Sequence, residues 1–129
     1  MATIREFELY RSIASDRLSD LHLGRDSRGE VVAIRMYGSR PGAEPALVES
    51  ILAAARKVQS IDHPGVVRVL AVSDVSPHFV ATSLPRGESL RTVLEEVWPL
   101  PPILAARVAS EIAAILDHVH EIRDANKRP

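Results

Sequence analysis

The chain has 129 residues, of which 46% are hydrophobic and 26% charged, so it is long enough and apolar enough to bury a core. Its 16 basic and 17 acidic residues leave a formal net charge of -1, which gives no long-range field to attract nucleic acid or anionic lipid. The absence of cysteine excludes disulfides and thiolate metal sites and is compatible with a reducing cytosol. No apolar run approaches the roughly 18 residues of a membrane span, so we expect a cytoplasmic protein without a membrane partner.

Residues 7–37 are rich in strand patterns. "FELYRSI" and "LSDLHLGRD" alternate apolar with polar side chains, and "VVAIRMY" has the composition of a short buried strand. "DSRGE" at 26–30 predicts the turn before this last strand, with Gly29 free to take a positive φ. Residues 38–45, rich in glycine and proline, predict a loop.

A helix is predicted over residues 46–61, because apolar side chains recur there at helical spacing. These side chains are Leu47, Ile51, Ala54 or Ala55, and Val58. Pro64 disfavours helical geometry at His63, which ends the helix.

Two further strand patterns follow, "VVRVLAVSDV" and "HFVATSL", and then a short helix, "LRTVLEEVW". We expect Trp98, at the end of this helix and before a run of prolines, to pack against other side chains. The strongest helical pattern covers residues 103–122 and carries an apolar stripe. Its members are Leu104, Val108, Ala109, Ile112, Ile115, Leu116 and Val119.

This order of elements predicts an α+β fold, in which an antiparallel sheet carries one packed helix and a short and a long amphipathic helix follow. We expect residues 1–129 to form a single domain. Within it, residues 7–84 form the sheet and its helix, residues 85–122 a turn and the later helices, and residues 123–129 a polar tail.

Four segments resemble parts of bacterial-type serine/threonine protein kinases, in the order and at the spacing of that family. They are "IASDRLSDLHLGRDSRGEVVAIRMY", "IDHPGVVRVLAVSDV", "LPRGESLRTVLEE" and "LPPILAARVASEIAAILDHVHE", and they run from about Tyr10 to Glu121. Arginine far outnumbers lysine, which is typical of GC-rich bacterial coding. The resemblance implies a kinase N-lobe-like sheet and helix, followed by the first helices of the C-lobe.

The resemblance also implies where a phosphate site would lie. The glycine positions of the family's phosphate-binding loop fall on Ala14, Asp16 and Ser19, and the strand lysine falls on Arg35. The helix glutamate that would hold this lysine falls on Ala54. Because Asp16 would repel a polyphosphate, we expect a degenerate site. Arg35 then either keeps an anion-binding role or extends to solvent or a nearby acid.

In the family, the catalytic loop and the metal-binding aspartate would follow residue 122. We therefore expect a truncated, degenerate member, a pseudokinase that is no enzyme and has no catalytic residue, metal or cofactor. His118 and His120 are two residues apart on one helix, so they face different directions and do not chelate a metal.

The apolar stripe on residues 103–122 needs a cover, because a kinase buries the corresponding helix under later elements of its C-lobe. The simplest cover is a second copy of the chain, so we expect a homodimer that acts as a protein-binding, scaffolding or regulatory module in signalling. A different protein partner is the alternative. Two other hypotheses stay open: a residual nucleotide-binding or phosphotransfer protein completed in trans by a partner, and a segment of a longer multidomain protein.

Overall fold

The computed structural model describes residues 2–38 and 44–126, and the chain divides into two compact units. The first, called the sheet unit below, comprises Met1–Asp62 and Val67–Leu84. The second, the helical unit, comprises His63–Val66 and Pro85–Pro129. All residues of the predicted phosphate site belong to the sheet unit, whereas the predicted interface helix belongs to the helical unit.

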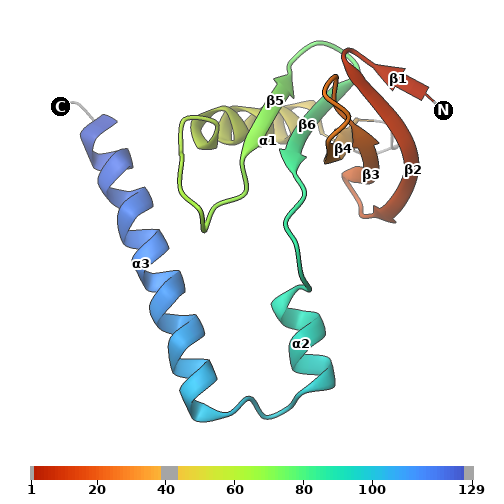
Figure 1. Ribbon diagram of the computed structural model, residues 1–129. Coiled ribbons are helices and arrows are strands. Elements are labelled where there is room, and N and C mark those ends of the chain that lie inside the picture. The colour runs from red at the N-terminus through yellow and green to blue at the C-terminus, as the bar shows by residue number, and fades with distance from the viewer. Residues whose placement is uncertain (1, 39–43, 127–129) are drawn as a thin grey trace. The chain divides into compact units, whose positions relative to one another are not determined.

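The sheet unit is built on a six-stranded antiparallel sheet in the order β1-β2-β3-β4-β6-β5 (Figure 1). Its strands are β1 (Ala2–Ile4), β2 (Phe7–Ser15), β3 (Ser19–Arg25), β4 (Val31–Tyr37), β5 (Val69–Ser73) and β6 (His78–Ser83). Every predicted strand is present. The sequence patterns miss β1, because its three residues are too few to show a two-residue period.

One face of the sheet holds the main apolar core, over which the curved strand β2 and its partner β1 fold (Figure 1). The buried side chains of this core are Ile4, Phe7, Leu9, Val32, Ile34, Phe79 and Ala81. Phe7 and Phe79 meet edge to face, with ring centroids 6.0 Å apart. Each fully buried side chain of this size contributes roughly 1.5–3 kcal/mol, so the cluster fixes the central strands β4 and β6.

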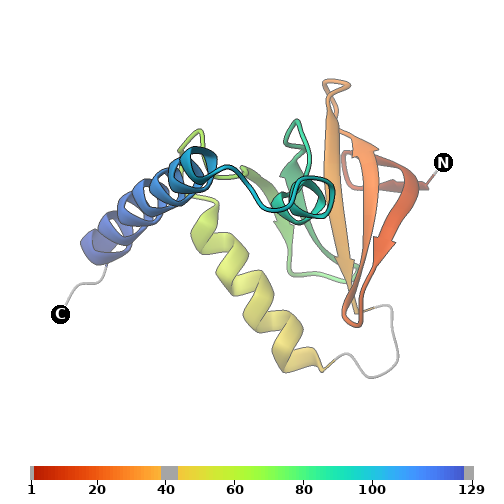
Figure 2. The same cartoon turned by 90° about the horizontal axis from the view of Figure 1, so that it is seen from below.

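The opposite face is covered by α1 (Pro45–Val58), which lies beside the sheet (Figure 2). Val48 and Leu52 are buried against Val80 of β6. The sequence pattern predicts that Leu47 lies on the buried side of this helix, but its side chain is 43% exposed. The buried side is shifted by one residue, to Val48 and Leu52. Apolar residues are consecutive along this helix, so periodicity alone does not select which of them face the sheet.

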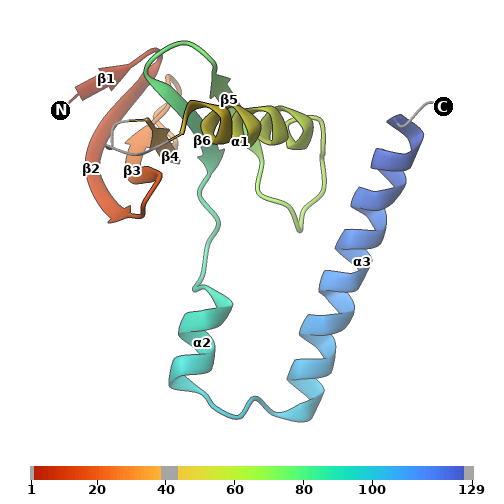
Figure 3. The ribbon, with the colours of Figure 1, turned by 180° about the vertical axis from the view of Figure 1, so that it is seen from behind.

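The helical unit contains α2 (Leu90–Glu96) and α3 (Pro102–Asn126), which run in opposite directions (Figure 3). Ser89 caps α2, because its Oγ accepts a hydrogen bond from the Thr92 N–H at 3.2 Å. The segment His63–Val66 packs on α3, and Ile115 lies so close to Gly65 that a methyl group added there would overlap it. The rings of His63 and His118 also meet, with centroids 4.8 Å apart.

The apolar stripe predicted on α3 is only partly covered. Its half-buried side chains are Val108, Ile115 and Val119. Its exposed side chains are Leu104 (50% exposed), Ile112 (47%), Leu116 (48%) and Ala109. The helix therefore presents a partly open apolar face.

Trp98 lies in the connection between α2 and α3 and is 76% exposed, so the prediction that it packs is wrong. No residue of α2 is buried, and this end of the helical unit therefore has no core to receive a large aromatic side chain.

The predicted α+β fold is confirmed. A curled antiparallel sheet with one packed helix, then a short helix and a long C-terminal helix, is a kinase N-lobe-like arrangement. The division into residues 7–84, 85–122 and 123–129 stays a prediction.

Candidate functional site

Arg35 projects from the face of the sheet that α1 covers. Val32 and Ile34 of β4 point into the main core, so Arg35 and Tyr37 point to the other side, where Tyr37 packs on the α1 cluster. In the register of β3 and β4, Leu21 lies opposite Arg35 and Ser19 opposite Tyr37. Arg35 therefore lies beside the end of β3 at which the turn from β2 arrives.

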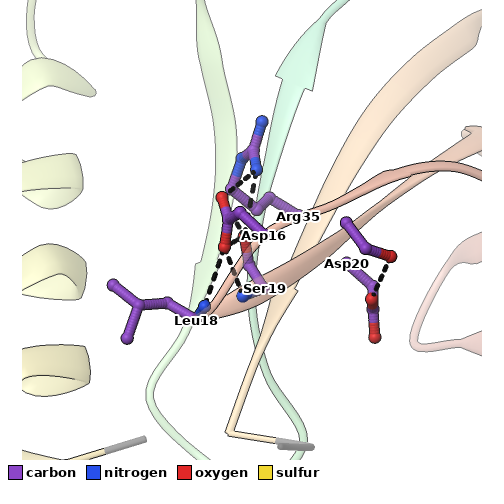
Figure 4. Close-up of polar contacts among 6 residues, drawn as sticks. Asp16, Leu18, Ser19, Asp20 and Arg35 are labelled. Carbon is purple, nitrogen blue, oxygen red and sulfur yellow. Dashed lines mark hydrogen bonds and ion pairs between the residues drawn. The ribbon is translucent and has the colours of Figure 1, made fainter.

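Asp16 closes this β2–β3 turn with its own carboxylate (Figure 4). Its Oδ1 accepts hydrogen bonds from the Leu18 N–H and the Ser19 N–H, each at 2.8 Å. The Asp16 N–H donates in turn to the Ser19 carbonyl at 2.9 Å. The turn is thus held by bonds to both the backbone and the side chain of Asp16.

The guanidinium of Arg35 joins the same cluster (Figure 4). Its Nη1 lies 3.2 Å from Asp16 Oδ2 and donates to Ser19 Oγ at 2.9 Å. The Ser19 hydroxyl lies 3.1 and 3.2 Å from the two carboxylate oxygens of Asp16, so it donates to Asp16 while it accepts from Arg35. Asp16, Ser19 and Arg35, called the turn cluster below, form a closed network.

The turn cluster favours the ionised form of Asp16. The pKa of this carboxyl is lowered from its ordinary 3.8, first by the hydrogen bonds from the Leu18 and Ser19 backbone N–H groups, with a smaller contribution from the charge of Arg35. Burial raises the pKa of the neighbouring Tyr37 phenol above its ordinary 10.0, while Arg35 acts in the opposite direction. At neutral pH the turn cluster therefore pairs a carboxylate with a guanidinium beside a neutral phenol.

Of the five residues of the predicted phosphate site, the structure brings three together and leaves two apart. Asp16, Ser19 and Arg35 are in contact, whereas Ala14 and Ala54 are exposed, on β2 and α1 respectively. Sequence reasoning also misses the Leu18 N–H as a donor. The signal for it is the spacing of Asp16 and Ser19, which is typical of an aspartate that caps the backbone two and three residues ahead.

A separate cavity of about 600 Å³ lies between α1 and the β5–β6 hairpin. Tyr37, Leu52 and His78 are among its lining residues. None of the predicted site residues lines it, so it is distinct from the turn cluster. His78 Nδ1 is buried there and finds no hydrogen-bond partner among the residues that the structure describes.

The described part of the chain offers neither a candidate metal site nor a candidate membrane span. Residues 2–38 and 44–126 contain no group of three histidine, cysteine, aspartate or glutamate residues that could hold a metal ion. None of the helices within these ranges has the length and apolar composition of a membrane span.

No family model matches the chain. It is 28% identical over 117 residues to serine/threonine-protein kinase pkn2 of Myxococcus xanthus, a match that covers 89% of this chain and 14% of that protein. It is 32% identical over 98 residues to serine/threonine-protein kinase 12 of Arabidopsis thaliana, covering 74% of this chain and 21% of that protein. The chain is similar to serine/threonine protein kinases. It spans about a fifth or less of the length of these kinase relatives.

This similarity corrects one prediction. The sequence patterns predict that the chain is no enzyme. This prediction is wrong, because the chain is similar to proteins that are named as kinases and so points to an enzyme family. The prediction rests on the motif positions Ala14, Asp16, Ser19 and Ala54 and on the catalytic loop that the resemblance places after residue 122, whereas the similarity to a named kinase extends over 89% of the chain. The predicted truncated and degenerate status, including the roles of these positions, stays a prediction.

Proposed function

We propose that this chain is the phosphate-binding lobe of a kinase-like phosphotransferase. In this proposal the sheet unit receives the phosphates of a nucleotide, and Arg35 neutralises part of their charge. The catalytic base and the metal ligands come from polypeptide outside the described residues, either a continuation of the chain or a partner that completes the site in trans. The similarity to two kinases, of which the chain spans 14% and 21%, supports a role as one part of such an enzyme.

The position of Arg35 carries the proposal. This cation projects from a central strand whose neighbouring residues, Val32 and Ile34, are fully packed, so its base is rigidly held. It points to the β2–β3 turn, where the resemblance places the phosphate loop. Kinase chemistry consists largely of positioning and charge neutralisation of phosphates, and a guanidinium presents a planar fork of donors that suits them.

A nucleotide titration followed by backbone amide NMR tests this function. With magnesium and adenosine diphosphate, we expect saturable shifts at the amides of the β2–β3 turn. Arg35→Gln should weaken binding about tenfold, which corresponds to the loss of one charge-assisted hydrogen bond of about 1.5 kcal/mol.

Arg56→Gln is the matched control. Arg56 pairs with Asp74 at 3.3 Å elsewhere in the sheet unit, so this variant removes the same charge and a similar ion pair without touching the turn cluster. Its nucleotide affinity should equal that of the wild type. A flat titration of the wild type, or equal losses in the two variants, would remove the proposed function.

The exposed face of α3 favours a second candidate function, self-association. Ile112 and Leu116 are one helical turn apart and 47% and 48% exposed, next to the half-buried side of the helix. Exposed apolar side chains in a row mark contact surfaces, and a second copy of α3 offers a matching one. In this candidate function, α3 forms the interface of a homodimer that acts as a scaffold.

Light scattering on a sizing column tests self-association. The monomer has a mass of 14.1 kDa, so a dimer has about twice that mass. Ile112→Asp should restore the monomer, because it places a charge in the apolar contact. Ser110→Asp adds the same charge to an exposed residue on the other side of α3 and should leave the dimer intact. A wild type that is monomeric at all concentrations counts against this candidate.

A further inference from the structure

We infer that the β2–β3 turn is a preformed oxyanion site whose occupant in this chain is the carboxylate of Asp16. A phosphate group binds there only when Asp16 leaves. The inference deepens the proposed function and rests on it for the source of the phosphate, namely a nucleotide. It assigns to Asp16 the role of a built-in competitor at the entrance to Arg35.

The donors around Asp16 have the chemistry of a phosphate site. The consecutive N–H groups of Leu18 and Ser19 point at Oδ1, the Ser19 hydroxyl reaches both oxygens, and Arg35 Nη1 lies 3.2 Å from Oδ2. Successive backbone amides form a concave anion site, and an arginine beside them adds the charge and the donors that phosphate oxygens accept. Asp16 supplies an anion to this arrangement from within the chain.

A second turn of the same chain shows what an aspartate needs merely to close a turn. Asp26 Oδ1 accepts from the Arg28 N–H and the Glu30 N–H, each at 2.9 Å, and so closes the β3–β4 turn. Among the described residues, no ion pair and no hydroxyl group joins that carboxylate. The Asp16 carboxylate also accepts two backbone N–H bonds, here from the consecutive residues Leu18 and Ser19. The Asp16 turn adds Arg35, which is 19 residues away in the chain, and the buried hydroxyl of Ser19. These added donors are what an anion site requires and a turn does not.

The exposure of the turn cluster permits the exchange of one anion for another. The Asp16 side chain is 57% exposed and that of Arg35 is 36% exposed, whereas Ser19 is fully buried. Asp16 therefore swings into solvent without opening the core, while Ser19 stays in place. A carboxylate bound to amides only two and three residues ahead competes at a high effective concentration, so it weakens phosphate binding without abolishing it.

The test is a titration with inorganic pyrophosphate, followed at the amides of Leu18 and Ser19. Asp16→Gly removes the occupant, and we expect its affinity for pyrophosphate to exceed that of the wild type about tenfold or more, since the tethered competitor is gone. Asp16→Asn keeps an oxygen that accepts the two backbone bonds, so its affinity should rise far less. Arg35→Gln in the Asp16→Gly background should remove the gain.

Asp26→Gly is the matched control, because it removes the same charge from an aspartate that closes a similar turn. It should bind pyrophosphate no better than the wild type. The inference is overturned if Asp16→Gly brings no gain with its sheet amides still dispersed as in the folded chain, or if Asp26→Gly brings an equal gain. An equal gain with Asp16→Asn also overturns it, because charge rather than occupancy would then explain the effect.

A parallel titration with adenosine diphosphate separates this inference from the proposed function. If Asp16→Gly gains affinity for pyrophosphate but no variant binds the nucleotide, the inference stands and the proposed function fails. If the wild type binds the nucleotide through Arg35 and Asp16→Gly changes neither ligand, the proposed function stands and the inference fails.

Discussion

Asp16 and Arg35 are neighbours for two separate reasons, the alternation of side chains along β4 and the hydrogen bonds of Asp16 to the β2–β3 turn. Alternation along β4 turns Val32 and Ile34 into the core and leaves Arg35 on the α1 side of the sheet. The aspartate is fixed independently by its bonds to the turn backbone. Both side chains are partly exposed, so their ion pair adds little to the stability of the fold. We expect the turn cluster to serve binding rather than folding.

The titration of Asp16 is the first prediction at the residue scale. Its lowered pKa means that the contribution of the ionised carboxylate to stability is present above pH 3.8 and is lost as the pH falls through the lowered pKa. NMR of the side-chain carboxyl carbon measures the midpoint, which should lie below 3.8. Because the backbone N–H groups of Leu18 and Ser19 are the leading cause, Arg35→Gln should raise this midpoint and still leave it below 3.8. A wild-type midpoint at or above 3.8 contradicts the geometry of the turn.

At the scale of single elements, sequence patterns predict most of the fold and little of the site. Alternation identifies β2 and β3, apolar composition identifies β4, and helical spacing identifies the longer helices α1 and α3. The resemblance names Asp16, Ser19 and Arg35, but not their contact. That contact depends on the strand register and on how the turn folds back, and neither is visible in residue spacing. The resemblance gives no sign that the carboxylate of Asp16 is itself the bound anion.

A pair of identical substitutions in α1 tests the face that this helix buries. Leu52→Ala should lower the free energy of unfolding by about 2–5 kcal/mol, because it leaves a cavity against β6. Leu47→Ala is the control and should cost less than about 1 kcal/mol, since that side chain is largely in water. The exposed fractions that underlie this contrast are 3% for Leu52 and 43% for Leu47. Chemical denaturation measures both values. A loss from Leu47→Ala equal to that from Leu52→Ala contradicts the observed packing of α1, and a larger loss from Leu47→Ala would favour the register predicted from the sequence.

At the scale of the whole molecule, the two units differ in how their side chains are buried. All buried hydrophobic residues of the described chain lie in the sheet unit, in β1, β2, β4, β6 and α1. The apolar side chains whose burial is described in the helical unit, up to residue 122, are at most half-buried, such as Ile115 beside Gly65. Regions with few buried apolar contacts open at a lower free energy than the core does. The two units are therefore expected to differ in local stability.

Native-state hydrogen exchange measures this difference directly. Amides of β4 and β6 should exchange slowest, through global unfolding, whereas those of α2 and α3 should exchange through smaller openings.

Repeating the exchange measurement at several protein concentrations tests the self-association of α3. If α3 closes its exposed face on a second copy, protection of its amides should rise with protein concentration, because binding stabilises the folded form by mass action. The amides of β4 then serve as the internal control. Protection of α3 equal to that of β4 at every concentration would show that the helical unit is as stable as the sheet and needs no second copy to cover it.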